Sequence, residues 1–187
     1  MSDADSLQLL LDAGAVLEGH FQYASGRHGD RYIEKFRLLE RPQTTADLCG
    51  QIAAAFRHAN VEVVVGPTTG GILLSHETAR NLGTKAFFAE SSEAGGRYIG
   101  RGFSFEPGQR TLVVDDVLTT GGSIRDTIAA VRAAGAEPVG VAVVVDRTNG
   151  QTAFADLPFF ACLSIEVASW DASECPLCRE GVELIVT

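Results

Sequence analysis

A run of apolar residues that ends in two carboxylates and then turns through threonine and glycine constrains this chain more than any other feature. The segment 112–114 predicts a buried strand, Asp115 and Asp116 follow it, and the turn at 119–122 leads into a helix. Glycines in such a turn permit positive φ and a close approach of the backbone to a ligand. The run therefore predicts a strand, a ligand-binding turn and a helix in immediate succession.

The turn is suited to phosphate, and the two acids are suited to sugar hydroxyls. Free N–H groups and the dipole at a helix start favour a dianion. Thr119, Thr120 and Ser123 add hydroxyl donors. Asp115 and Asp116 would repel phosphate, so we expect them to accept hydrogen bonds from the vicinal hydroxyls of a ribose, or to reach a metal ion through water. Together these residues predict a ribose 5-phosphate site.

The length of the run decides how specific it is. A shorter piece would indicate only a strand end and a turn, because junctions rich in Asp and Gly are common. The whole run resembles the phosphoribosyl diphosphate (PRPP) signature of the type I phosphoribosyltransferases. The chain lacks the G-x-x-x-x-G-K-[ST] of a P-loop and the G-x-G-x-x-G of a dinucleotide fold, so nucleoside triphosphates and NAD are poor candidates.

A second glycine-rich loop at 66–71 follows a predicted strand and precedes a predicted helix, which makes it another candidate for anion binding. With the signature, it completes the PRPP site that the resemblance implies. The residues so implied are Asp115, Asp116, Val117, Leu118, Thr119, Thr120, Gly121, Gly122, Ser123, Thr68, Thr69 and Gly70.

Strands and helices alternate after residue 40, which predicts an α/β fold with a mostly parallel central sheet flanked by helices. A capping box at 44–47 predicts a helix that runs to about His58. Another at 123–126 predicts a helix through Ala134, with Gly135 at its C′ position. The run 139–145 is apolar nearly throughout, so it should be a central strand buried on both faces. The loops at 66–71, 115–123 and 146–149 should then meet at the carboxyl edge of the sheet, where open α/β sheets bind ligands.

The 187 residues suit one α/β domain and are short for two. We expect a single phosphoribosyltransferase domain over 1–187, with an N-terminal hood in 1–40 and an α/β core in 41–187. A polar, glycine-rich stretch near 90–110 interrupts the core. A structureless loop of that length is uncommon unless it serves as a lid or a hairpin, so we expect a long lid loop there.

The charge balance argues against polyanionic partners. The formal net charge is -9, from 24 acidic and 15 basic residues. Binding to nucleic acid or to a membrane surface is therefore not expected. No run approaches the ~18 apolar residues of a membrane span, and the segment 1–5 lacks the basic start of a secretory signal. We expect a cytoplasmic protein.

Two of the four cysteines, Cys175 and Cys178, form a single C-x-x-C. One such pair cannot complete a tetrahedral zinc site, and no histidine lies near it in the sequence. We expect a structural role for the pair with reduced thiols, and zinc shared across a dimer is the alternative.

Four segments narrow the resemblance to one bacterial branch of the orotate phosphoribosyltransferases. They are the hood segment 19–32, the loop 66–71, the Val145-Asp146-Arg147 run and the tail 174–181. The resemblance covers nearly the whole chain. It implies orotate and PRPP as substrates, and a homodimer whose lid loops are shared across the interface.

Orotate is a planar carboxylate, and a fixed guanidinium fork suits it. Arg147 is the candidate for that contact, with a surface ion pair to Asp146 as the structural alternative. The resemblance implies that Thr119 also bonds orotate and that backbone groups near Arg31 and Tyr32 contact the base.

The implied reaction is an attack of orotate N1 on C1 of PRPP, which releases pyrophosphate, inverts the anomeric centre and yields orotidine 5′-monophosphate in pyrimidine biosynthesis. It is assisted by Mg²⁺, held mainly through PRPP, with Asp115 or Asp116 reaching it through water. No residue is expected to be a dedicated metal ligand. The candidate catalytic residues are Asp115, Asp116, Arg97 and Arg101.

The lid departs from the family pattern. Ser91 and Ser92 occupy its expected basic positions, and the only cations from Glu90 to Gly102 are Arg97 and Arg101. Ala24 stands where some relatives place a donor-binding lysine. Two alternatives therefore stay open. One is a PRPP-binding sensor or regulator on the same fold, and the other is a purine phosphoribosyltransferase.

Overall fold

The computed structural model describes residues 3–23, 25–148, 150, 154 and 156–187. Its main sheet has six strands in the order β5-β4-β3-β6-β7-β8. All neighbouring strands in it run parallel except β4 and β5, which form an antiparallel pair. The strands are β3 (Val63–Pro67), β4 (Lys85–Ser91), β5 (Arg97–Ile99), β6 (Arg110–Leu118), β7 (Glu137–Asp146) and β8 (Phe159–Ser164).

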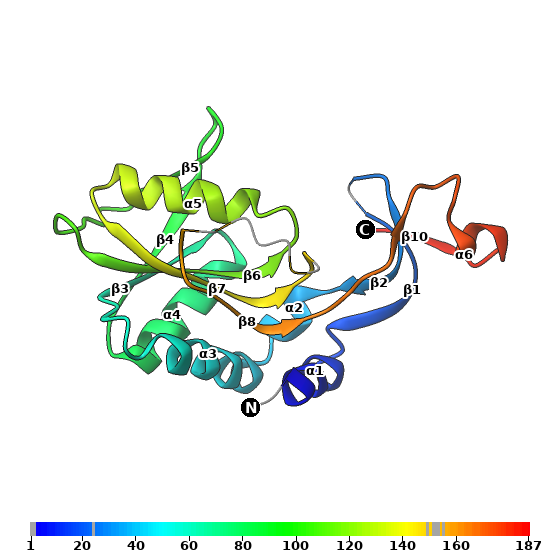
Figure 1. The fold of residues 1–187 in the computed structure, drawn as a ribbon, viewed down its shortest axis with the longest axis horizontal. Helices are drawn as coiled ribbons and strands as arrows, with labels where there is room; N and C mark the ends of the chain where they lie inside the picture. The colour runs from blue at the N-terminus through cyan, green and yellow to red at the C-terminus, as the bar shows by residue number, and fades with distance from the viewer. Residues whose placement is uncertain (1–2, 24, 149, 151–153, 155) are drawn as a thin grey trace.

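Helices cover both faces of this sheet (Figure 1). On one face, α3 (Pro42–Phe56) and α4 (Gly70–Leu82) lie over the strands, and α1 (Asp3–Asp12) packs beside them. The other face is covered by α5 (Gly122–Ala133). Successive residues of a strand point to opposite faces, so Val64 packs in the cluster of the α3 side and Val65 in that of the α5 side. The predicted α/β sheet with flanking helices is confirmed.

The apolar run at 139–145 is confirmed as a central strand. It lies within β7, between β6 and β8, and every residue of β7 after Glu137 is buried. The helix before it ends as expected, because Gly135 follows the cap Ala134 with φ 86°.

Two helix starts differ from the prediction. The helix expected from a capping box at 44–47 begins earlier, with Pro42 in its first turn and no side-chain cap from Arg41. Proline needs no N–H partner at that position and its φ suits a helix, so it sets the start. The hydroxyl of Thr45 donates instead to the Leu38 carbonyl at 3.3 Å. Likewise α5 begins at Gly122, after Gly121 with φ 77°.

A second sheet forms a hood beside the carboxyl edge of the first (Figure 1). Its strand order is β10-β1-β2-β9, so it contains strands from both ends of the chain. The expected division at residue 40 therefore describes the hood only in part. The remaining elements are β1 (Val16–Gln22), β2 (His28–Ile33), α2 (Lys35–Leu39), β9 (Ser169–Trp170), α6 (Pro176–Arg179) and β10 (Leu184–Val186).

The stretch expected as a lid loop is partly a hairpin. Strands β4 and β5 pair antiparallel, and the hairpin projects from the sheet (Figure 1). After it, the chain is fastened to the core, because the ring of Phe103 stacks on Phe87 at 4.5 Å and Phe105 contacts the same ring at 5.0 Å. Among the described helices, none has the length and apolar character needed to cross a membrane.

Candidate active site

A cavity of about 700 Å³ lies between the hood and the carboxyl edge of the main sheet. It joins two groups of residues that the sequence predicted separately, the turn after β6 and Arg147 after β7. The hood and the segment before β9 supply the other walls. The lining residues are Tyr23, Ser25, Tyr32, Thr119, Thr120, Arg147, Val167, Ser169 and Thr187.

Asp115 and Asp116 lie near the end of β6 and are 7% and 5% exposed. The Asp115 carboxylate accepts from the Asp116 amide at 2.9 Å, and the Asp116 carboxylate accepts from the Val117 amide at 2.7 Å. The ammonium of Lys35, on α2, lies 3.1 Å from Asp116 Oδ2. The acids are thus held in place by the backbone and by one cation.

The pKa of Asp115 is raised from 3.8 to about 6. Burial is the main cause, because it penalises the charged carboxylate, and the negative charge of Asp116 adds to it. The Asp116 amide, Lys35 and the Ser123 hydroxyl oppose the rise without cancelling it. The ionised form of Asp115 is therefore disfavoured in the protein free of ligands.

This raised pKa makes a testable prediction for the protein free of substrate and Mg²⁺. A carboxyl whose pKa is higher in the folded chain stabilises it below about pH 4, and that contribution is lost as pH rises through about 6. Asp115→Asn removes the effect while its amide oxygen still accepts from the Asp116 amide. We expect the variant to gain stability relative to the parent, by up to about 3 kcal/mol, between about pH 4 and pH 7.5.

Urea denaturation at a series of pH values measures this difference. Asp126→Asn is the matched control, because Asp126 is exposed on α5 and should show little change with pH. A stability difference for Asp115→Asn that is independent of pH would contradict the raised pKa.

The turn after β6 has the features expected of a phosphate site. Gly121 adopts φ 77°, and Thr119 and Thr120 are exposed at the cavity. Among the described residues, no side chain caps the start of α5. Its first N–H groups therefore stay free to bind an anion.

The 66–71 loop lies against the acids of β6. A Cβ on Gly70 would press on the Asp116 carboxylate and on Leu39, so the close approach requires glycine. Arg97 reaches this loop from β5, donating Nη1 to the Thr68 hydroxyl at 3.2 Å and to the Ala89 carbonyl at 3.1 Å. The structure thus places Arg97 at the loop of its own subunit.

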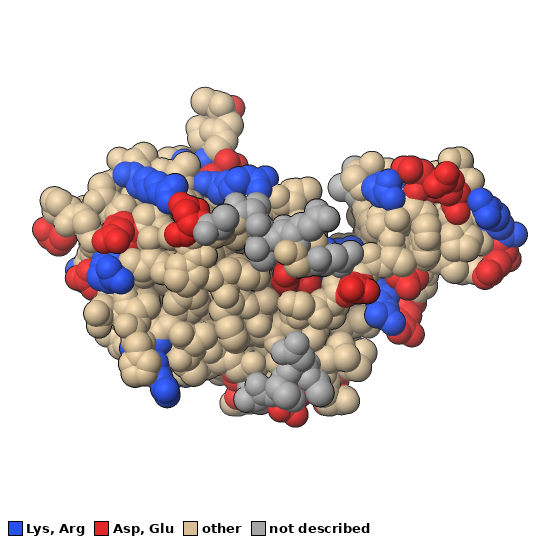
Figure 2. All heavy atoms as spheres, viewed as in Figure 1, with Lys and Arg blue, Asp and Glu red and all other residues tan. Residues whose placement is uncertain are grey.

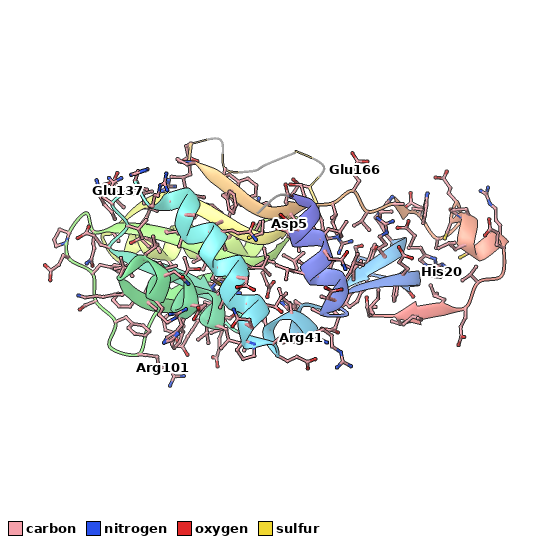
Figure 3. The ribbon with its side chains drawn as sticks, turned by 90° about the horizontal axis from the view of Figure 1, so that it is seen from below. Asp5, His20, Arg41, Arg101, Glu137 and Glu166 are labelled. Carbon is pink, nitrogen blue, oxygen red and sulfur yellow. The ribbon has the colours of Figure 1, made fainter. Side chains whose placement is uncertain are left out.

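Arg101 is not brought to the cavity. It points outward (Figure 3), its side chain is 69% exposed, and its guanidinium pairs with Glu90 at 2.8 Å. That contact lowers the pKa of Glu90 and raises that of Arg101. Over the face seen in Figure 2, basic and acidic side chains are interspersed.

Arg147 forms one wall of the cavity. Its guanidinium lies over the Tyr23 ring, 5.0 Å from the centroid, and its buried Nε has no partner among the described residues. The ion pair with Asp146 considered above is not seen. Asp146 accepts from the Thr148 amide at 2.8 Å, and within the described part of the chain it forms no salt bridge. A half-buried guanidinium at a cavity wall, with an unused Nε donor, is suited to an anionic ligand.

The hood closes the other side of the cavity. The Tyr23 hydroxyl donates to the Arg31 carbonyl at 2.5 Å, and burial raises the pKa of Tyr23 although Arg147 opposes the shift. Tyr32 lines the cavity, whereas the Arg31 side chain turns to Glu18 at 3.6 Å. Ala24, at the position where some relatives place a donor-binding lysine, lies outside the described residues.

Sequence reasoning missed two features of the hood. One is Lys35, which reaches Asp116 across 81 positions. The one sequence feature that could have singled it out is that this acidic chain contains only two lysines. The other corrects the expectation that no histidine could assist the C-x-x-C. None is near it in the sequence, but in the folded chain His20 and His28 contact Cys178 at 3.6 and 3.3 Å.

Comparisons with known proteins agree with this geometry. The profile of the family described as phosphoribosyl transferase domain matches residues 38–178. The chain is 44% identical to an orotate phosphoribosyltransferase of Chlorobaculum parvum, over 98% of this chain and 94% of that protein. It is also 44% identical to one of Heliobacterium modesticaldum, over 99% and 97%.

Solved structures show the same fold. The orotate phosphoribosyltransferase of Mycobacterium tuberculosis in complex with Fe(III) dicitrate superposes with a TM-score of 0.72 at 28% identity, over 87% of this chain and 96% of that one. The same enzyme in complex with PRPP superposes with a TM-score of 0.68 at 25% identity, over 87% and 95%.

Proposed function

The chain belongs to the orotate phosphoribosyltransferase family, and we propose that it transfers the phosphoribosyl group of PRPP to N1 of orotate in pyrimidine biosynthesis. The observation that carries this proposal is the shared cavity. It joins the turn after β6, which directly follows the two buried acids, to a guanidinium with an unused donor and to aromatic residues of the hood. One substrate is a sugar phosphate and the other a planar carboxylate, and the cavity suits both.

PRPP would lie along the carboxyl edge. The free N–H groups and hydroxyls of 119–123 would bind its 5-phosphate, and Asp115 and Asp116 would accept from the ribose hydroxyls. The pyrophosphate would lie at the 66–71 loop, where Arg97 supplies a cation. Negative charge grows on the leaving pyrophosphate, so a positioned cation lowers the barrier.

Mg²⁺ fits the donor chemistry of this edge, because the two carboxylates are hard oxygen ligands. Burial and the charge of Asp116 raise the pKa of Asp115, and a cation beside the pair would stabilise the ionised form. Asp115 or Asp116 would hold it through water, together with PRPP. The ion would supply charge stabilisation for the departing pyrophosphate.

Orotate would lie under the hood. Arg147 would bind its carboxylate, Thr119 would donate to it, and Tyr32 with the backbone near Arg31 would hold the base in plane. N1 then attacks C1 as pyrophosphate leaves, and the product is orotidine 5′-monophosphate. Positioning the two substrates in one cavity would supply much of the rate.

The loss of orotate ultraviolet absorbance on mixing with PRPP and Mg²⁺ tests this function. Uracil and adenine serve as alternative acceptors in separate reactions. Orotate-specific loss is expected. PRPP binding without turnover would favour a sensor, and turnover with adenine alone would favour a purine enzyme.

All four cysteines are free, as in a reducing compartment, which supports a cytoplasmic location.

We also propose a homodimer with lids shared across its interface. Arg101 supports this, because it projects from the hairpin, its side chain is exposed and its guanidinium is paired with Glu90 instead of facing the cavity. Mixing Arg101→Ala chains with Asp116→Asn chains should then restore part of the activity, since one site of each hybrid keeps both residues. Verified hybrids without recovery would indicate that Arg101 does not act across the interface.

A further inference from the structure

Four metal-ligating side chains meet in the hood, outside the cavity described above. They are His20 on β1, His28 on β2, Cys175 directly before α6 and Cys178 within it. One ligand atom of each lies within 4.8 Å of the other three. From this convergence we propose that the hood binds one Zn²⁺ ion in a Cys₂His₂ site. Two thiolates with two imidazoles are a usual donor set for structural zinc.

The distances suit a tetrahedral ion. Bond lengths of about 2.3 Å to sulfur and 2.0 Å to nitrogen place S and N ligands about 3.5 Å apart and two nitrogens about 3.3 Å apart. Cys175 Sγ lies 3.4 Å from His20 Nε2, and Cys178 Sγ lies 3.6 Å from His20 Nε2 and 3.3 Å from His28 Nδ1. The two nitrogens are 2.9 Å apart, so they need separate by only a few tenths of an ångström.

A hydrogen bond to the backbone fixes the tautomer of His20 in the form that can bind the ion through Nε2. His20 Nδ1 lies 2.9 Å from the carbonyl oxygen of Val182, which can only accept, so Nδ1 carries the proton. The lone pair of the neutral ring is then on Nε2, the atom that faces the cysteines. Ligating histidines commonly donate their other N–H in this way, which fixes the ring and raises its basicity.

Burial indicates a closed structural site with one open side. His20, His28 and Cys175 are 1%, 5% and 0% exposed, whereas Cys178 is exposed. His20, labelled in Figure 3, lies in the hood near the C-terminal segment. The ion would enter past Cys178 and then lie between buried donors.

The apolar residues of β10 bury little surface in the hood. Every residue of β10 is exposed, and Ile185 and Val186 are 50% and 75% exposed. A small sheet without a core of its own commonly depends on a metal or a disulfide. Zinc would join the β1–β2 hairpin to residues 175–178, and so hold the C-terminal segment, including Thr187 at the cavity wall.

Metal content tests the proposal without any activity measurement. The full chain, with any affinity tag removed and under reductant, is incubated with Zn²⁺ and dialysed before zinc and protein are quantified. We expect one zinc per chain. Co²⁺ in its place should give the visible absorption of tetrahedral thiolate coordination. Cys178→Ser removes an exposed ligand, so the fold should survive, and zinc affinity should fall at least about a hundredfold.

The chain supplies its own controls, since it has two further cysteines and two further histidines. Cys49→Ala, Cys162→Ala, His58→Ala and His76→Ala should keep one zinc per chain. His28→Ala should lose it, with near-native circular dichroism. A parent chain that holds no zinc and gives no cobalt band would overturn the site, as would a Cys178→Ser/His28→Ala chain that keeps its zinc. A Cys175–Cys178 disulfide that persists under reductant would overturn it too.

Discussion

Replacing Asp116 by asparagine is expected to lower kcat/KM for PRPP about a hundredfold or more. Asp116 is 5% exposed, and its orientation is fixed by the Val117 amide and by Lys35. A hydrogen bond to an ionised group contributes about 1.5–3 kcal/mol, and loss of about 3 kcal/mol is roughly a hundredfold in rate. Asparagine has nearly the same shape, so the loss would report the charge.

Lys35 should be coupled to this effect. In Asp116→Asn, the Lys35 ammonium loses its partner 3.1 Å away, so part of the loss arises from an uncompensated cation. Lys35→Met alone should also lower kcat/KM, and the double variant should be less impaired than the product of the two single effects.

Steady-state kinetics with PRPP varied measure these effects. Asp126→Asn, an exposed acid on α5, is the matched control. Circular dichroism and thermal unfolding establish that each variant is folded. A folded Asp116→Asn enzyme with unchanged kcat/KM would remove this acid from the PRPP site.

The main sheet could be predicted because its signals are local. The apolar run of β7 and the glycine at 135 each determine structure from their immediate neighbours, and both were confirmed. The hood could not be predicted in the same way. Strand β10 pairs with β1, placing Leu184 opposite His20, and its exposed residues carry no alternation that indicates a partner.

The same distinction applies to the candidate site. Thr119 and Arg147 end neighbouring strands of a parallel sheet, so topology alone brought them to one edge. The Lys35–Asp116 contact depends on how α2 lies against the core, and the histidines beside Cys178 depend on how the two ends of the chain meet in the hood. A sequence records neither, because the contacts span 81 and at least 150 positions. The side chains of Arg31 and Arg101 pair with Glu18 and Glu90 instead of facing the cavity.

Replacing Arg147 by alanine should lower kcat/KM for orotate by about two to three orders of magnitude. The guanidinium is held over the Tyr23 ring and has an unused buried donor at the cavity. Two charge-assisted bonds to one carboxylate are together worth about 3–5 kcal/mol. Arg147→Lys keeps the charge but loses the planar fork, so its loss should be intermediate.

Uracil separates a carboxylate contact from a general loss of structure, since uracil is orotate without its carboxylate. If Arg147 binds that group, Arg147→Ala should abolish most of the preference for orotate over uracil and leave the KM for PRPP nearly unchanged. Arg132→Ala, which removes an exposed arginine paired with Asp156, is the control and should change neither. A variant that loses activity toward both bases in equal proportion would show that Arg147 supports the cavity wall, and the recognition of orotate would then have to come from the hood.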